Sequence, residues 1–192
     1  MRERLYRRIR AVARALMLVL FPIRASGMEH VPPGGAGMLC INHISLIDPI
    51  AVACAMQRPV HFIGKRELFK GRFLAWFLGS LGALPVNRGG SDLAAMRASL
   101  QVLKNGGLLG VFPQGHRYKK DDVHELETGA AMLALRSGAP VIPVHIAPGY
   151  RLFRRLRVRV GAPVDLSDLG GKVDADAMRE VSRRIADAIW AK

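Results

Sequence analysis

Short apolar runs alternate with segments of helical periodicity along most of the chain. Short runs suit buried strands, and apolar positions that recur every three or four residues suit helices with one buried face. This alternation predicts a single α/β domain with a largely parallel central sheet flanked by helices. The predicted strands are 38–41, 61–63, 84–86, 108–112, 141–146 and 156–160. The predicted helices are 49–56, 67–78, a segment from Ser91 to Gly106, 126–136, and a last one capped by Asp174 with Met178, Val181, Ile185 and Ile189 facing inward.

The first 24 residues are strongly basic, with seven arginines and a single glutamate. On a helical wheel, one arc about 100° wide holds six apolar side chains: Leu5, Ile9, Val12, Leu16, Val19 and Leu20. Arg7, Arg10 and Arg14 lie opposite this arc. Such a helix suits the surface of an anionic membrane, and the alternative is a first helix docked on the protein's own core. We therefore divide the chain into a membrane-surface helix, 1–24, and a domain, 25–192.

The composition of the chain is that of one globular domain. It has 192 residues, of which 50% are hydrophobic and 23% are charged. The longest mainly apolar run, 15–23, has about half the length that a bilayer-spanning helix requires. Cys40 and Cys54 are too few for a disulfide framework, and both stand in apolar stretches. We expect reduced thiols and a peripheral protein on the cytoplasmic face of the membrane.

The net charge of +14 favours phosphate-rich partners. A nucleic acid would satisfy the charge, but the sequence has no zinc-finger spacing and no motif for base stacking. The best argument for a nucleic acid is the arginine cluster within 151–159. Because Val158 and Val160 alternate with arginines there, we interpret the cluster as an edge strand with a basic outer face. We expect an anionic membrane surface as a partner and no nucleic acid.

His43 and Asp48 follow the first predicted strand of the domain, where ligand sites of parallel sheets form. On one helix, side chains five residues apart would point in different directions. Pro49 keeps Asp48 out of the α region and suits the first position of a helix, so a turn can bring the two side chains together. The carboxylate would then orient the imidazole as a general base. The alternative, a capping aspartate beside an incidental histidine, fits the spacing equally well.

Two further strand ends combine arginine with glycine. Arg88 precedes two glycines, and Gly115 lies two residues before Arg117. Glycine lets a backbone N–H approach an anion, and the guanidinium fork matches phosphate oxygens. Taken singly, each segment is more typical of a solvated loop than of a phosphate site. Together, at one sheet edge with a histidine–aspartate pair, they predict a base beside a phosphate site; the histidines have no metal-ligand spacing, so we expect no metal.

The ordered motifs resemble the glycerophospholipid acyltransferase family, the PlsC-like 1-acylglycerol-3-phosphate acyltransferases. His43 and Asp48 match its first block, and 62–88 resembles the second. Residues 112–117 stand at the third block, and 141–144 resembles the fourth. The similarity extends over residues 27–166, and four blocks in order are far more specific than any one of them.

The resemblance implies a direct reaction without a cofactor or metal. His43 would take the proton from the sn-2 hydroxyl of a lysophosphatidate-like acceptor, and Asp48 would fix its tautomer. The alkoxide would attack the thioester of acyl-CoA or acyl carrier protein and give phosphatidate. The acceptor phosphate would be held by Arg88, Gly115 and Arg117. Residues in possible supporting positions are Asn42, Ser45, Lys65, Gln114 and His116.

The third block departs from the family pattern. Gln114 and His116 stand where the family usually has glutamate and threonine. These changes leave other acceptors open, namely another lyso-lipid or glycerol phosphate, with a role in lipid remodelling. An alternative of another class is a non-catalytic membrane-binding or lipid-binding protein, which would have no need for both His43 and Asp48.

Overall fold

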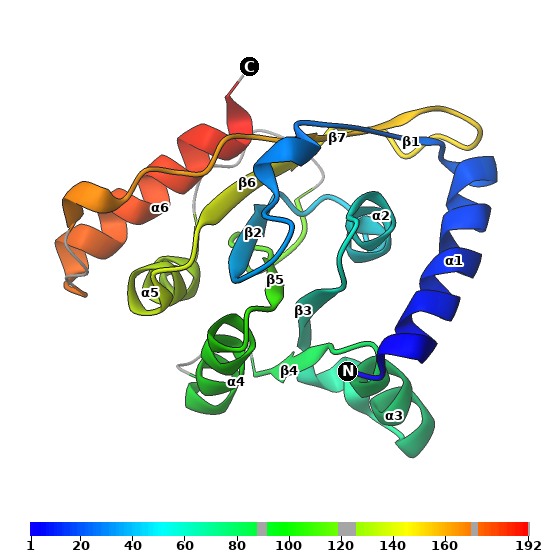
Figure 1. Cartoon of the computed structure of the whole chain (residues 1–192), viewed down its shortest axis with the longest axis horizontal. Helices are drawn as coiled ribbons and strands as arrows, with labels where there is room; N and C mark the ends of the chain where they lie inside the picture. The colour runs from blue at the N-terminus through cyan, green and yellow to red at the C-terminus, as the bar shows by residue number, and fades with distance from the viewer. Residues whose placement is uncertain (88–91, 119–125, 170–172, 192) are drawn as a thin grey trace.

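The computed structural model describes residues 1–87, 92–118, 126–169 and 173–191. These residues form a seven-stranded sheet with helices on both faces (Figure 1). The spatial order is β1-β7-β6-β2-β5-β3-β4, and every neighbouring pair is parallel except β6 and β7. The predicted α/β class with a largely parallel sheet is confirmed. The strands are β1 (Ile23–Ser26), β2 (Gly37–Ile41), β3 (Val60–Lys65), β4 (Leu84–Val86), β5 (Leu108–Val111), β6 (Val141–Ile146) and β7 (Leu156–Val160).

The helices form two layers, one on each face of the sheet. Figure 1 shows α1 and α2 on one side and α4, α5 and α6 on the other, while α3 lies near the start of α1. The layers are built on the alternation of strand side chains: in β2, Leu39 and Ile41 pack toward the first layer, and Met38 and Cys40 toward the second. The helices are α1 (Glu3–Leu20), α2 (Asp48–Ala55), α3 (Arg72–Ser80), α4 (Leu93–Lys104), α5 (Thr128–Ser137) and α6 (Ala175–Trp190).

Both cysteines are buried and unpaired. Cys40 belongs to the cluster under α4, α5 and α6, whereas Cys54 belongs to the cluster under α1 and α2. The sheet therefore separates the two thiols. Burial raises the pKa of Cys40 to about 12, so this thiol behaves as an apolar core group.

One strand is absent from the sequence prediction. β1 pairs in parallel with β7, from Ile23 opposite Leu156 to Ser26 opposite Arg159. The interpretation of 156–160 as an edge strand is therefore wrong, because β7 lies between β1 and β6. The alternation within β7 is as expected, with Leu156, Val158 and Val160 buried and Arg157 exposed. The predicted division of the chain after residue 24 falls within β1. The division into a membrane-surface helix and a domain stays a prediction.

Two helix boundaries differ from expectation. The predicted helix 67–78 is divided into a 3-10 turn, η2 (Arg66–Phe69), and α3. Gly71 lies between them with φ +85°, a conformation that interrupts a right-handed helix. α4 is capped by Asp92, whose side chain accepts from the Ala95 N–H at 3.0 Å, whereas the predicted cap, Ser91, lies outside the described residues. The last helix is as predicted, with Asp174 as its cap.

The helix α1 docks on a different arc from the one its apolar residues define. Tyr6 and Met17 are buried, while Val12, Leu16 and Val19 of the predicted arc are 62%, 57% and 63% exposed. The buried arc lies beside the predicted one, so α1 both packs on the core and presents an apolar stripe outward. None of the described helices is long and apolar enough to cross a bilayer.

The position of Arg10 also shows that α1 packs on the core with a different side from the one predicted. We expected it to point away from the apolar arc, together with Arg7 and Arg14. Instead, its guanidinium donates to the carbonyls of Met56 and Gln57, each at 3.1 Å, just after α2 ends. This arginine therefore fastens α1 to the domain rather than facing solvent.

Candidate active site

The C-terminal ends of β2, β5 and β6 meet at one edge of the sheet, because β2 lies between the other two strands. Asn42 follows β2, and its side-chain amide exchanges two hydrogen bonds with the backbone of Ile146, at 2.9 and 2.7 Å. The His43 N–H donates to Gln114 Oε1 at 2.7 Å. These bonds join the three strand ends and fix the backbone on which His43 stands.

His43 and Asp48 are brought together by the turn between β2 and α2. His43 Nδ1 lies 2.8 Å from Asp48 Oδ2, which also accepts the backbone N–H groups of Ile44 and Ser45 at 2.7 Å each. The two side chains come together as expected, but not in the expected way: α2 begins at Asp48, so Asp48 is already helical and Pro49 takes the second helical position instead of the first. Asp48 is fully buried and His43 nearly so. The predicted proximity is present, and the catalytic role of the pair stays a prediction.

The imidazole of His43 has a defined orientation. An ionised carboxylate only accepts hydrogen bonds, so Nδ1 carries the proton and Nε2 of the neutral ring is left with its lone pair. The Phe112 ring stacks on the imidazole, with 4.1 Å between centroids and 28° between planes. The ring is thus held by a hydrogen bond at one edge and an aromatic contact on one face. A group held in this way can accept a proton at Nε2 from a hydroxyl at the sheet edge.

Tyr150 is a member of this site that the sequence analysis missed. Its hydroxyl donates to Asp48 Oδ1 at 2.6 Å, so both carboxylate oxygens have donors. Burial raises the pKa of Tyr150 well above its usual range, and the neighbouring Asp48 carboxylate raises it further. The phenol therefore stays protonated and remains a donor. It follows the C-terminal end of β6, which is the kind of position where such residues are expected.

The predicted phosphate site is only partly described. Arg88 lies outside the described residues. Arg117 is exposed, and its neighbour Tyr118 donates its N–H to the His43 carbonyl at 2.9 Å, which ties this segment to the histidine. The Gly115 N–H is bonded to the Phe112 carbonyl at 3.0 Å, so a phosphate would have to share or replace that bond.

The supporting residues separate into two groups. Ser45 and Gln114 bond to the dyad or its backbone, and Asn42, next to His43, bonds to the backbone of Ile146 at the end of β6. His116 is exposed with its ring 4.2 Å from that of Tyr118, and Lys65 forms an ion pair with Glu67 at 3.2 Å. The structure therefore brings the first group to the dyad and gives the second group other partners.

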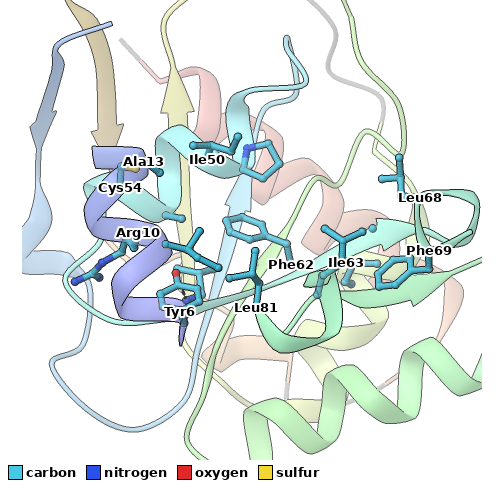
Figure 2. A pocket seen from close by; sticks show the side chains of 17 residues that line it. Tyr6, Arg10, Ala13, Ile50, Cys54, Phe62, Ile63, Leu68, Phe69 and Leu81 are labelled. Atoms are coloured by element: carbon cyan, nitrogen blue, oxygen red, sulfur yellow. Dashed lines mark hydrogen bonds between the residues drawn. The ribbon is translucent and has the colours of Figure 1, made fainter. Parts of the chain in front are cut away.

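An apolar pocket of about 230 Å³ lies between α1, α2, β3 and α3. Figure 2 shows aliphatic and aromatic side chains from these elements around it, among them Ile50, Phe62 and Leu81. His43 and Asp48 do not line the pocket, but their neighbours do. Pro49, which lines the pocket, follows Asp48 directly. Phe62, which also lines it, stacks on Phe112 with 6.0 Å between ring centroids, and Phe112 contacts the imidazole. The ring of Phe112 thus lies between Phe62, which lines the pocket, and the imidazole of His43.

Within the described ranges, no three or more His, Cys, Asp or Glu side chains are grouped so as to hold a metal ion. The predicted absence of a metal and of a cofactor stays a prediction. What the geometry does provide is an oriented imidazole, a buried carboxylate with four donors, and an adjoining apolar pocket.

Comparisons with known proteins agree on a family. A family model described as Acyltransferase matches residues 22–147. The 1-acyl-sn-glycerol-3-phosphate acyltransferase of Bacillus subtilis (strain 168) is 26% identical over 175 residues, with 86% of this chain and 87% of that protein covered. The Streptococcus pneumoniae protein of the same name is 29% identical over 155 residues, with 77% of this chain but only 57% of that protein covered.

The fold agrees with a solved structure as well. The crystal structure of the 1-acyl-sn-glycerophosphate acyltransferase PlsC from Thermotoga maritima superimposes with a TM-score of 0.69 at 24% identity, covering 100% of this chain and 82% of that chain. The chain belongs to the Acyltransferase family, and it is an enzyme of the acyltransferase class. The family resemblance drawn from the four sequence blocks is confirmed, and the non-catalytic alternative is set aside.

Proposed function

We propose that this enzyme moves a fatty acyl group from a thioester donor to the sn-2 hydroxyl of a 1-acylglycerol-3-phosphate and so forms phosphatidate for phospholipid synthesis. The observation that carries the proposal is the 2.8 Å contact between His43 Nδ1 and Asp48 Oδ2, which leaves Nε2 as the available base. The named relatives from Bacillus and Streptococcus support the choice of acceptor.

The chemistry follows from the orientation of the imidazole. Nε2 of His43 takes the hydroxyl proton while the acceptor oxygen attacks the thioester carbonyl. The tetrahedral intermediate expels the thiolate, and the imidazolium returns the proton to the leaving sulfur. Asp48 stabilises the imidazolium through its contact with Nδ1, and its carboxylate is held in place by the Ile44 and Ser45 N–H groups and by the Tyr150 hydroxyl.

The apolar pocket is suited to a fatty acyl chain. Burial of methylene groups contributes about 0.8 kcal/mol each, so a chain of ordinary length is bound strongly by such a surface. The ring contacts from Phe62 through Phe112 to His43 connect the pocket to the base. We place the acyl chain in this pocket with its carbonyl end toward the imidazole.

Cationic groups near the sheet edge would hold the acceptor phosphate. Arg117 is the described cationic candidate, the Gly115 N–H is a neutral donor beside it, and Arg88 lies outside the described residues. Gln114 carries no charge where the family pattern has glutamate, yet its oxygen still accepts from the His43 N–H. The departure in this block therefore leaves the support of the histidine intact. Acyl-CoA and acyl carrier protein are both acidic donors and suit a chain with a net charge of +14.

The acceptor is a lipid, so we place the reaction at the surface of an anionic membrane on its cytoplasmic face. The exposed residues Val12, Leu16 and Val19 of α1 provide an apolar stripe for this contact. Arginines on the same helix would contact lipid phosphates.

The test is a transfer assay with matched acceptors. Purified protein is given acyl-CoA or acyl carrier protein together with dispersed 1-acylglycerol-3-phosphate, 1-acylglycerol or lysophosphatidylcholine. Free thiol and the lipid product are followed by colorimetry and mass spectrometry. We expect transfer to the phosphate-bearing acceptor at the sn-2 position, and much slower transfer to 1-acylglycerol. Equal rates with and without the phosphate would contradict the proposed acceptor.

A further inference from the structure

The loop between β6 and β7, residues 147–155, contains charge that the proposed reaction does not use. It holds three of the five arginines of the cluster noted in the sequence. Arg157 and Arg159 belong to β7, and Arg159 donates to the carbonyls of Ile189 and Ala191 at the end of α6. Arg151, Arg154 and Arg155 remain on the loop, and all three are exposed.

The tip of this loop is apolar. The Arg154 N–H donates to the Arg151 carbonyl at 3.0 Å and closes a turn whose central residues are Leu152 and Phe153. Their side chains are 60% and 69% exposed. A leucine and a phenylalanine thus project from the most prominent part of a loop whose flanks are cationic.

Phe153 is held in an unfavourable backbone conformation. Its φ is +62°, and in the described residues no other position except glycine has a positive φ. This position of a turn favours glycine or asparagine, so a phenylalanine there needs another reason. Its N–H donates to the Leu20 carbonyl at 2.7 Å, which fixes the turn to the last residue of α1.

The base of the loop is tied inward while the tip points outward. The Tyr150 hydroxyl bonds to Asp48, and its ring meets that of Phe21 edge-on at 5.5 Å. Figure 1 shows the loop beside the C-terminal end of α1. The end of α1, where Leu16 and Val19 are exposed, therefore lies next to the turn at Leu152 and Phe153.

The charge around the tip is unneutralised by the described part of the protein. No ion pair there joins Arg151, Arg154 or Arg155 to a carboxylate. Apolar side chains that are ringed by unpaired arginines complement an anionic bilayer, which has acyl chains beneath a layer of phosphates. A single-stranded nucleic acid would use the arginines and Phe153, but it would give Leu152 and the adjoining stripe of α1 no partner.

We propose that the β6–β7 loop is a second membrane-docking element, in which Leu152 and Phe153 enter an anionic bilayer and the three arginines contact lipid phosphates. The choice of a lipid surface rests on the proposed function. The loop and α1 would then rest on the same membrane, with the sheet edge that carries His43 close to its surface.

The test compares vesicle binding of full-length variants. Binding to mixed phosphatidylcholine–phosphatidylglycerol vesicles and to pure phosphatidylcholine vesicles is measured by co-sedimentation. The variant L152S/F153S should bind the mixed vesicles roughly tenfold more weakly than wild type. The matched control Leu93→Ser removes an exposed leucine from α4, on the opposite layer, and should bind like wild type.

A second variant separates docking from folding. Phe153→Gly removes the ring and relieves the positive φ, so its thermal unfolding midpoint should equal or exceed that of wild type while its vesicle affinity falls. The variant R151Q/R154Q/R155Q should lose most of the preference for mixed over neutral vesicles. Affinity of L152S/F153S within twofold of wild type would overturn the proposal, as would equal losses in L152S/F153S and Leu93→Ser.

Two further readouts keep the proposals apart. If R151Q/R154Q/R155Q loses affinity for a single-stranded oligonucleotide but keeps its affinity for mixed vesicles, the lipid assignment is wrong. Turnover of a dispersed short-chain 1-acylglycerol-3-phosphate by the wild type is measured in parallel. Turnover together with unchanged affinity of L152S/F153S overturns the docking proposal alone. Absence of turnover together with lost affinity supports docking and overturns the proposed acceptor.

Discussion

The helices α1 and α6 are similar in composition but differ in how much of their apolar surface is buried. Both are amphipathic and rich in arginine, and they lie on opposite faces of the sheet (Figure 1). α6 buries its apolar residues Val181, Ile185 and Ile189 completely. α1 instead buries Tyr6 and Met17 and leaves much of its apolar arc exposed.

The two helices also differ in how their arginines are paired. In α6, each arginine forms an ion pair with a carboxylate of the same helix, and Arg184 also pairs with Asp168. In the described part of α1, Arg7 has an ion pair with Glu3, and Arg10 donates to backbone carbonyls. An amphipathic pattern alone therefore does not tell how much of a helix's apolar arc is buried. The two helices differ instead in charge pairing and in the location of the buried arc.

The difference extends to the two layers of the molecule. The layer of α4, α5 and α6 closes one face of the sheet with a continuous apolar core. The layer of α1 and α2 contains the apolar pocket, and its turn before α2 carries the dyad. We expect changes in the first layer to affect mainly stability and changes in the second to affect mainly activity and membrane binding.

The largest effect should come from His43→Ala in the turn before α2. Removal of the base should lower kcat/KM for acyl transfer by about 10²–10⁴-fold, as measured by thiol release. His30→Ala is the matched control, because its imidazole contacts the Val160 carbonyl instead of Asp48. A folded His43→Ala protein with near-normal turnover would remove the catalytic role from the dyad.

The contrast between the two helices is sharpest in a pair of apolar substitutions. Ile185→Ala in α6 should lower the free energy of unfolding by about 3 kcal/mol, because it leaves a cavity in the core. Leu16→Ala in α1 should change it by no more than about 0.5 kcal/mol, because that side chain is largely exposed. Denaturant titration of both variants gives the comparison, and equal losses of stability would break it.

Tyr150→Phe should have an intermediate effect on turnover. It removes the donor to Asp48 Oδ1 but keeps the ring against Phe21. A lost hydrogen bond to a buried charge costs about 1.5–3 kcal/mol, part of which we expect in kcat as a decrease of roughly tenfold. KM for the acceptor should stay nearly constant, since we expect Tyr150 to position Asp48 and not to contact substrate. A change confined to KM would assign the phenol to substrate binding instead.

The smallest effect concerns the ion pairs on α6. Arg183 and Arg184 lower the pKa of Glu180 to about 2, so these pairs stabilise the fold above the ordinary glutamate pKa and are lost as the pH falls toward 2. Because the pairs are exposed, Glu180→Gln should lower the unfolding midpoint at neutral pH by no more than about 2 °C. The difference from wild type should shrink as the pH is lowered toward 3. A difference that grew on acidification would have the wrong sign for this ion pair.

Much of the sheet and the dyad could be predicted from the sequence because local signals were strong. The strands 141–146 and 156–160 are apolar runs or strict alternations, and the structure has the same bounds. Pro49 indicated a helix start close to Asp48 and so a turn that can bring Asp48 to His43, although the spacing alone left a capping aspartate equally open. In each case the information lay within a few neighbouring residues.

The remaining features depend on contacts between distant segments. β1 has four residues, Ile-Arg-Ala-Ser, and becomes a strand because β7 offers it a parallel partner. The docking arc of α1 depends on how Tyr6 and Met17 fit the core, which a helical wheel does not contain. The strand-end rule extends to β6 and so to the region of Tyr150, but nothing in the local sequence marks that residue as a partner of Asp48.

Because β6 and β7 are antiparallel, the first helix ends at the edge of the sheet that carries the dyad. β6 runs toward the edge of the sheet that carries the dyad, so β7 runs away from it, and β1, parallel to β7, begins at that edge. Leu20 and Phe21 must therefore arrive where β6 finishes, within reach of Phe153 and Tyr150. Had β7 continued in the common direction, residue 23 would start at the far rim, and α1 would finish a full strand length from His43 and Asp48. One reversal of chain direction thus brings the end of α1 to the dyad.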